Sequence, residues 1–278
     1  MNNIYVMSDI HGAYEQYEQM KKKIKFDITD TLYIIGDIFD RGPGTYKILA
    51  DVMKSKNIHL LLGNHEYAYV QIYKNMKLFD ETKDKRYKDS IDMWKNYISD
   101  PAAGGAGTID FLFNKIKKSQ RETYLEYLSN CPTDKLLNVN GKNIYLTHGS
   151  ISKYEMARVT ERIDMFPLYL LLFDEKEQLD AVACVNLLNI NKKNEKSLQK
   201  ELAAMASEGW MTDPIIIFGH TPVKYYNKYN KDMKIITAGN NINIDCGCNG
   251  YNFGEPDKDG FIGHLACLCL NTMEEFYI

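Results

Sequence analysis

The feature that most restricts the fold of this 278-residue sequence is a set of five short polar segments, each directly following a strand-like run. They read SDIHG, GDIFDRG, GNHE, THGS and FGHTP. In open α/β sheets, the loops at the carboxyl ends of the strands converge on one edge, where ligands bind. We therefore expect the polar side chains of all five segments to meet at one place: Asp9, His11, Asp37, Asp40, Asn64, His65, His148 and His220.

The order of the predicted elements is typical of this fold class. Strands are expected at 4–7, 31–35 and 58–62, with helices at 14–24 and 45–56 between them, and this βαβαβ order indicates α/β layering. Residues 68–128 have a mainly helical pattern, interrupted by the glycine-rich stretch PAAGGAGT at 101–108, which predicts a loop. Further strands are expected at 142–147, 214–218, 234–237, 242–246 and 263–270 and near the carboxyl end.

Length and composition favour one globular domain over 1–278, with 45% hydrophobic residues and a largely helical, cap-like insert at about 152–212. The 34 basic and 37 acidic residues are interleaved, so no basic stripe predicts a nucleic-acid partner. No leader segment precedes the first strand, and the longest apolar run, 168–173, is far shorter than the roughly 20 residues that span a bilayer. We expect a soluble, cytoplasmic protein that does not bind a membrane.

The residue types in the five segments predict a metal site. Carboxylate and amide oxygens with imidazole, and without thiolate, suit manganese, iron or zinc, and the number of ligands favours two ions. His59 and His264 lie inside apolar strand-like runs and are interpreted as structural. Four cysteines form two C-x-C pairs, which are interpreted as small buried hydrophobic residues and not as a zinc or redox site.

Taken in this order, the motifs resemble those of the calcineurin-like metallophosphoesterase superfamily. The resemblance is to its PPP-type serine/threonine phosphatases, in particular the bacterial and phage branch, and to the related diadenosine tetraphosphatases. It covers most of the chain and includes the segment from Trp94 through GGAGT and the late segment NIDCGC. It implies an α/β fold, a four-layer αββα sandwich of two mixed β-sheets, with the metal site at the carboxyl ends of the strands.

The resemblance also implies roles for individual residues. Two divalent metal ions are expected, with Mn²⁺ first and iron or zinc as alternatives; their ligands would be Asp9, His11 and Asp37 for one, and Asp37, Asn64, His148 and His220 for the other. His65 resembles the general acid of the family, oriented by Asp40, and a histidine paired with a carboxylate stays protonated for that task. Arg41 resembles a phosphate-binding arginine, because its planar guanidinium can bind two phosphoryl oxygens.

These roles predict a metal-dependent phosphoesterase that hydrolyses phosphomonoesters, such as phosphoserine or phosphothreonine in proteins, by attack of a metal-bridging hydroxide. The alternative is a dinucleotide polyphosphate hydrolase of the diadenosine tetraphosphate type. A catalytically silent binding scaffold is less favoured because every core ligand is present, and a nuclease is disfavoured by the acidic charge. The substrate is therefore a phosphoprotein or a small phosphoester or dinucleotide.

The chain departs from the family pattern at three places. Leu62 stands where the eukaryotic-type and phage-type members carry arginine, and the diadenosine tetraphosphatases also carry leucine there. Glu66 stands where the diadenosine tetraphosphatases usually carry aspartate. A second phosphate-binding arginine is not identified, since only Arg158 and Arg162 lie in the expected interval.

Overall fold

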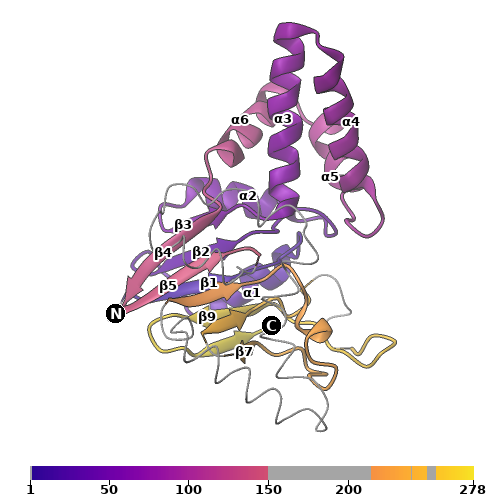
Figure 1. Ribbon diagram of the computed structural model, residues 1–278. Coiled ribbons are helices and arrows are strands. Elements are labelled where there is room, and N and C mark those ends of the chain that lie inside the picture. The colour runs from indigo at the N-terminus through magenta and orange to yellow at the C-terminus, as the bar shows by residue number, and fades with distance from the viewer. Residues whose placement is uncertain (1, 150–213, 239, 249–254) are drawn as a thin grey trace.

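The computed structural model describes residues 2–149, 214–238, 240–248 and 255–278. The predicted insert at about 152–212, with both of its arginines, lies outside these residues. Within them the chain forms two five-stranded mixed sheets (Figure 1). The first has the order β10-β9-β1-β2-β3. Its strands are β1 Ile4–Met7, β2 Thr31–Ile35, β3 Ile58–Leu61, β9 Ala266–Cys269 and β10 Glu275–Tyr277. β1, β2 and β3 run parallel, while β9 is antiparallel to both of its neighbours.

The second sheet has the order β4-β5-β6-β8-β7. Its strands are β4 Asp134–Val139, β5 Lys142–Thr147, β6 Ile215–Phe218, β7 Ile236–Ala238 and β8 Asn241–Asn243. β5, β6 and β8 are parallel, and β4 and β7 pair antiparallel at the two edges. Each sheet thus contains three adjacent parallel strands, at one side of the first sheet and in the middle of the second, and the polar loops follow strands of these groups.

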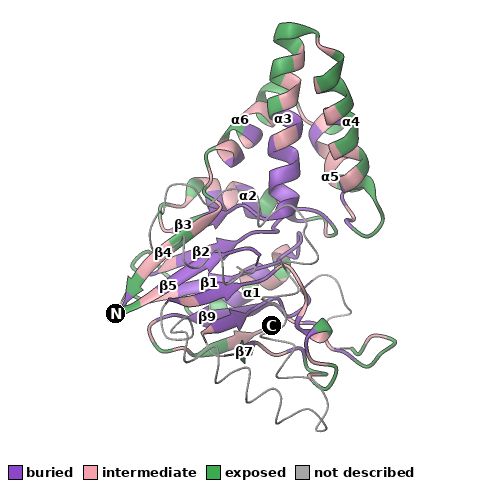
Figure 2. Ribbon diagram, in the orientation of Figure 1, coloured by how far each residue is buried: buried purple, intermediate pink, exposed green. Residues whose placement is uncertain are grey.

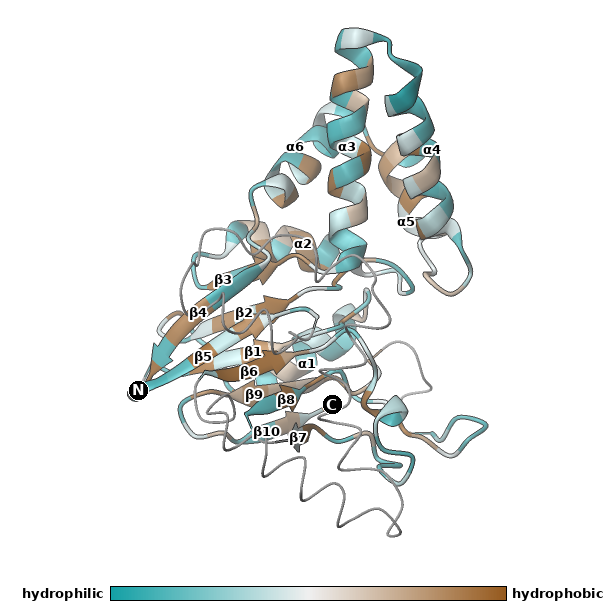
Figure 3. Cartoon of the chain, viewed as in Figure 1, coloured by the Kyte–Doolittle hydropathy of each residue, from teal (hydrophilic) through white to brown (hydrophobic). Residues whose placement is uncertain are grey.

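The two sheets pack face to face through an apolar layer. Val6, Ile35 and Leu61 of the first sheet belong to the same buried cluster as Leu146 and Ile217 of the second. Side chains alternate between the faces of a strand, so the neighbours of Val6, Tyr5 and Met7, belong instead to the cluster on the helical side. The β-branched and aromatic residues of these strands suit this double-sided burial, which appears as the purple centre of Figure 2 and the brown strands of Figure 3.

Helices cover the outer face of the first sheet. α1 (Tyr14–Lys23) and α2 (Thr45–Lys54) bury one face each, and α1 ends with three lysines, which suit the negative end of its dipole. The remaining helices stand away from the sheets as a helical projection (Figure 1). It comprises α3 (Asn64–Thr82), α4 (Lys85–Ser99), α5 (Ala106–Asp110), the π-helical turn η1 (Phe111–Lys115) and α6 (Lys118–Ser129). No helix within the described residues is both long and apolar enough to cross a membrane.

The predicted α/β class and the pair of mixed sheets are confirmed. Strand β4 was missing from the prediction, because its partly buried residues give no strong alternation. α3 begins at Asn64 and not near residue 68, and the predicted loop at 101–108 ends at Gly105, where α5 follows. The outer face of the second sheet packs, within the described residues, against the 3-10 turn η3 (Val223–Tyr225) and Tyr226, Met233 and Phe261.

Two predictions on structural residues have different outcomes. The four cysteines of the C-x-C pairs are buried, as predicted, and burial raises the pKa of the Cys246, Cys248 and Cys267 thiols. His59, in contrast, is exposed on the edge strand β3 and lies against the ring of Tyr33, with ring centroids 5.1 Å apart. It belongs to neither group of possible metal ligands among the described residues, and its structural role stays a prediction.

Candidate metal centre

The structure brings the eight predicted polar residues of the five segments together. Their loops follow β1, β2, β3, β5 and β6, and the third of these loops passes directly into α3. All eight are buried except His220, which is partly buried. Burial of so many ionisable groups in one place is costly unless they are paired or bind cations.

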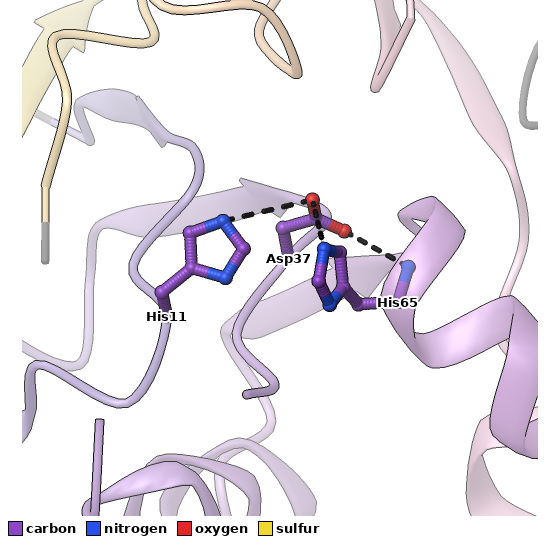
Figure 4. Close-up of side chains that lie close together, drawn as sticks. All are labelled: His11, Asp37 and His65. Carbon is purple, nitrogen blue, oxygen red and sulfur yellow. Dashed lines mark hydrogen bonds and ion pairs between the residues drawn. The ribbon is translucent and has the colours of Figure 1, made fainter. Parts of the chain in front are cut away.

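One group of possible ligand atoms consists of His11, Asp37 and His65 (Figure 4). Oδ2 of Asp37 lies 3.8 Å from Nε2 of His11 and 3.8 Å from Nε2 of His65. Oδ1 of Asp9 lies 4.0 Å from the same nitrogen of His11. Four side chains from three loops therefore surround one small space.

A second group consists of Asp37, His148 and His220. Nε2 of His148 lies 3.2 Å from Oδ2 of Asp37 and 3.0 Å from Oδ1 of Asn64. Nδ1 of His220 lies 2.9 Å from the same oxygen of Asn64. Asp37 is common to both groups, which is the arrangement that a carboxylate bridging two cations requires.

Hydrogen bonds to the backbone fix which nitrogen of two histidines faces the centre. Nδ1 of His11 lies 2.8 Å from the carbonyl oxygen of Phe39, and Nδ1 of His148 lies 2.9 Å from that of Ile35. Each Nδ1–H donates to its carbonyl, so Nε2 is left to act as a ligand. Metal-binding histidines are held in this way in most proteins.

The residues present fit divalent cations. Oδ1 of Asp9 is buried and has no hydrogen-bond partner within the described part of the chain, although its other oxygen accepts hydrogen bonds from Ser8 Oγ and from the His220 N–H at 2.9 Å. A buried carboxylate oxygen without a donor normally binds a cation or a water. The donor set of carboxylate, amide and imidazole is the one expected for such a cation.

The charges of the centre are strongly coupled. Burial alone would raise the pKa of Asp37, but the neighbouring His148 and His65 hold it well below its usual range. Burial alone would lower the pKa of His148, but Asp37 beside it raises that pKa to about 10. Burial and the adjacent His148 lower the pKa of His220 to about 3. Without a cation, a proton on His148 balances the charge of Asp37, so a cation must displace that proton to bind.

The loops that carry these residues have an unusual backbone. Positive φ angles, rare outside glycine, occur at Asp9 (52°), His11 (45°), Asp37 (55°), Asp40 (68°) and His220 (70°). Hydrogen bonds between the loops hold them there, such as that from the His11 N–H to the carbonyl of Asp37 at 2.8 Å. Such strain is found mainly at functional sites, where the surrounding structure imposes it.

Glycines allow the loops to approach so closely. A Cβ on Gly63 would lie 2.1 Å from Oδ1 of Asp37, and one on Gly219 would lie 2.1 Å from Oδ2 of Asp9. Both contacts are far shorter than any side chain permits, so the glycines of the GNHE and FGHTP motifs are required by the packing of the ligands.

His65 is part of a chain of hydrogen bonds beside the metal groups. Its Nδ1 lies 2.7 Å from Oδ2 of Asp40, and Oδ1 of Asp40 accepts a hydrogen bond of 2.7 Å from the hydroxyl of Tyr69. Burial would lower the pKa of His65, but Asp37 and Asp40 outweigh it and raise that pKa. The two carboxylates therefore favour the protonated imidazole, and Nε2 is directed toward Asp37.

Sequence reasoning missed the function of Glu66 in this centre. Its carboxylate is fully buried and accepts hydrogen bonds from the backbone N–H groups of Asp37 (2.8 Å), Phe39 (2.9 Å) and Gly63 (2.9 Å). Burial raises its pKa to about 7. Glu66 thereby ties the loop after β2 to the start of α3. The acidic residue at the third position of a helix was a signal that could have indicated this role.

Two tyrosines were also missed. Tyr69 follows His65 by four residues, a spacing that puts both on one face of α3. Tyr97 of α4 accepts a hydrogen bond of 3.1 Å from the amide of Asn64. Asn64 thus has its amide nitrogen held by Tyr97 while its oxygen faces the two late histidines, and that orientation is the one a metal ligand needs.

Arg41, the ninth predicted residue, lies at the edge of the centre and is exposed. Its φ is 62°, and its backbone N–H donates to the carbonyl of Gly104 at 3.1 Å. Together with burial, its positive charge lowers the pKa of His11, so the guanidinium acts electrostatically on the centre from the solvent side.

Parts of the chain are similar in sequence to known proteins. Relatives include a symmetrical bis(5'-nucleosyl)-tetraphosphatase of Buchnera aphidicola (subspecies Schizaphis graminum), 37% identical over 91 residues, and one of Wigglesworthia glossinidia brevipalpis, 38% identical over 79 residues. The first alignment covers 32% of each chain, and the second covers 28% of this chain and 29% of the relative. The chain thus matches about a third of the length of these curated relatives.

The fold and the family are also found in solved structures and in family models. A crystal structure provisionally assigned as a diadenosine tetraphosphatase shares the fold, with a TM-score of 0.51 at 15% identity over 100% of this chain and 93% of that one. Residues 3–246 match the model of the calcineurin-like phosphoesterase family. Because this match covers most of the chain, the chain belongs to the calcineurin-like phosphoesterase family.

Proposed function

We propose that this protein is a metal-dependent phosphoesterase that hydrolyses dinucleotide polyphosphates of the diadenosine tetraphosphate type. The observation that carries the proposal is that relatives 37% and 38% identical over their aligned parts are named symmetrical bis(5'-nucleosyl)-tetraphosphatases. The alternative weighed from the sequence is therefore better supported than the first expectation of a phosphomonoesterase acting on proteins.

Leu62 supports the same choice. The eukaryotic-type and phage-type protein phosphatases that the motifs resemble carry arginine at this position, whereas the diadenosine tetraphosphatases carry leucine. Here the side chain of Leu62 is buried at 5% exposure, and its N–H donates to the carbonyl of Pro132 at 2.8 Å. This position therefore contributes to the core and offers no charge to a phosphorylated peptide.

Two divalent cations would be held by the side chains that converge on Asp37. One would be bound by Asp9, His11 and Asp37, and the other by Asp37, Asn64, His148 and His220. When bound, such a pair withdraws charge from phosphoryl oxygens and lowers the pKa of water, so that a nucleophile is available near neutral pH. Manganese is the first ion to test.

His65 would donate the proton that the leaving group needs. Asp40 accepts the hydrogen bond from Nδ1 at 2.7 Å, which leaves Nε2 directed at the centre and raises the pKa of the imidazole. A histidine held in this way acts as a general acid until the pH rises above its pKa. Asp40 and Tyr69 serve as positioning residues for it.

Arg41 would bind a phosphate of the substrate. It is the exposed cation nearest in sequence to the catalytic pair, and its planar donors match two phosphoryl oxygens. Asp40 and Arg41 both have positive φ angles (68° and 62°), and Asp40 is buried against His65 while Arg41 is exposed to solvent.

The experiment that tests the proposal compares two substrates on chelator-stripped protein supplied with Mn²⁺. We expect kcat/KM for diadenosine tetraphosphate to exceed that for a phosphothreonine peptide, and the products to be two molecules of ADP, as a symmetrical cut requires. A preference for the peptide would overturn the proposal in favour of a protein phosphatase. Inactivity on both substrates with metal bound would indicate a silent scaffold.

Asp37→Asn tests the bridging role of Asp37. It keeps the shape of the bridging residue but removes its charge, so metal occupancy and activity should fall together. Activity retained with two ions bound would contradict the bridging role proposed for Asp37.

A further inference from the structure

A cavity of about 400 Å³ lies beside the metal centre, and the proposed chemistry does not use most of its wall. Its lining comes from the loop after β2 and the start of α2, from the glycine-rich segment around Gly104 and Thr108, from the π-helical turn η1 and from Tyr124 of α6. This volume is within the range of pockets that bury small organic molecules.

One end of the cavity is continuous with the catalytic loop. Phe39 and Arg41, which flank Asp40 in sequence, both line it. The carbonyl of Phe39 accepts the hydrogen bond that orients His11, and the N–H of Arg41 donates to the carbonyl of Gly104, which also lines the cavity. A molecule bound in the cavity therefore has its near end at the phosphate-binding arginine.

Part of the cavity wall is aromatic, formed by Tyr46, Phe111 and Tyr124. The rings of Tyr46 and Phe111 are stacked, with centroids 4.8 Å apart and planes inclined by 19°. Tyr46 is 39% exposed, so its side chain is not fully covered by this stacking. Phe111 begins the π-helical turn η1, and turns of this kind occur frequently at functional sites.

The polar groups of the wall suit an anionic ligand with hydrogen-bonding edges. Arg41 and Lys115 supply positive charge, and none of the lining residues, all within the described part of the chain, is acidic. Lys115 pairs with Asp110 at 2.8 Å in solvent, where such a pair exchanges readily. Oγ1 of Thr45 is buried without a hydrogen-bond partner in the described residues, and Thr45 belongs to the same wall.

We propose that this cavity binds one nucleoside of the substrate, with its base stacked on Tyr46 and its phosphates leading past Arg41 to the metal centre. The inference rests on the proposed function, and it assigns that function a specificity site. Bases stack on aromatic side chains irrespective of their hydrogen-bonding pattern, so the site would accept dinucleotides with different bases.

The test uses the full-length protein with Mn²⁺ and the variants Tyr46→Ala and Tyr46→Phe. Inhibition constants for AMP and for inorganic phosphate are measured against hydrolysis of p-nitrophenyl phosphate. We expect Tyr46→Ala to weaken inhibition by AMP, relative to that by phosphate, roughly 5- to 150-fold, the effect of losing one stacked base. Tyr46→Phe keeps the ring and should keep the ratio.

Tyr229→Ala is the matched control, because Tyr229 is 68% exposed and is not part of the cavity wall. An unchanged ratio of the two constants in Tyr46→Ala would overturn the inference, whether or not dinucleotides are substrates. Equal weakening of inhibition by AMP in Tyr46→Ala and in Tyr229→Ala would also overturn the inference.

Hydrolysis of diadenosine tetraphosphate separates this inference from the proposed function. If the wild type does not cleave diadenosine tetraphosphate while inhibition by AMP still depends on Tyr46, the proposed function fails and the nucleoside site stands. If Tyr46→Ala weakens the binding of a phosphothreonine peptide and leaves the inhibition constant of AMP unchanged, the cavity holds a peptide side chain and the inference is wrong.

Discussion

Helix α3 contributes to two clusters in which two of its side chains bind one carboxylate, and one cluster is buried while the other is exposed. At its start, His65 and Tyr69 both bind the carboxylate of Asp40, each at 2.7 Å. Two turns later, Tyr73 and Lys77 bind the carboxylate of Glu126, at 3.0 and 2.9 Å. The four residues are spaced at intervals of four, so they form one stripe along the helix.

The two carboxylates differ in burial and not in hydrogen-bond length. The side chain of Asp40 is fully buried, whereas that of Glu126 is 56% exposed. A buried acceptor that loses its donor stays unsatisfied, while an exposed one binds water. The comparison predicts that substitutions along the stripe have effects that fall steeply from His65 to Lys77, although every contact looks equally good.

The largest effect is expected at His65. In His65→Asn, metal content should be unchanged, while kcat falls roughly 10²- to 10⁴-fold for a substrate with a poor leaving group, because the general acid is lost. The loss should be smaller for a dinucleotide, whose leaving phosphate needs protonation less.

A pH profile checks this role. Activity of the wild type on the poor leaving group should fall as the pH rises through the raised pKa of His65, since the proton is then lost. The variant should lack this alkaline limb. Equal losses on both leaving groups, or a limb that persists in His65→Asn, would contradict the acid role.

The next largest effect is expected at Glu66, which lies off the stripe but in the same turn. Glu66→Gln removes a carboxylate that accepts three backbone hydrogen bonds, and the amide of glutamine cannot replace both oxygens. We expect Mn²⁺ affinity to fall about 10- to 100-fold, as for other residues that orient metal ligands. Calorimetric titration measures it, and Glu66→Asp, which keeps the charge, should lose less.

A smaller effect is expected at Tyr69. Tyr69→Phe leaves one buried oxygen of Asp40 without its donor, which should lower the free energy of unfolding by about 1–3 kcal/mol. Urea denaturation measures it, with Tyr73→Phe as the matched control, since the hydroxyl of Tyr73 binds the exposed Glu126. Equal losses in the two variants would show that burial does not set the difference between the clusters.

The sequence predicted two residues of the first cluster, but not the residues that hold them in place. Asp40 and His65 were assigned to one site because each follows a strand of a parallel sheet, and the carboxyl ends of such strands meet at one edge. Tyr69 and Glu66 were not assigned, because their roles depend on how α3 is oriented against the loop after β2. The start of α3 meets that loop at the close contact of Gly63 with Asp37, two residues that are far apart in the sequence.

The second cluster could not be predicted. Tyr73 and Lys77 meet Glu126 of α6 across about fifty residues, and one glutamate in a charged helix has no feature that selects its partner. The cavity beside Arg41 was missed for a similar reason. Tyr46, Phe111 and Tyr124 come from separate elements, and each resembles an ordinary core aromatic in sequence. Long-range pairing on a surface leaves little trace in sequence, whereas metal ligands fall in recognisable motifs.

The smallest effect is expected at the far end of the stripe. Lys77→Ala should change neither kcat/KM for diadenosine tetraphosphate nor the midpoint of thermal unfolding, because the ammonium and the carboxylate of Glu126 are 54% and 56% exposed and both return to water. The measurement is a thermal melt at low and at high salt. A pair that stabilised the fold would make the melting temperature of the wild type depend on salt and that of the variant independent of it. The first result would show that the pair contributes to stability despite its exposure, and a fall in activity would mean that the outer half of α3 is coupled to the centre.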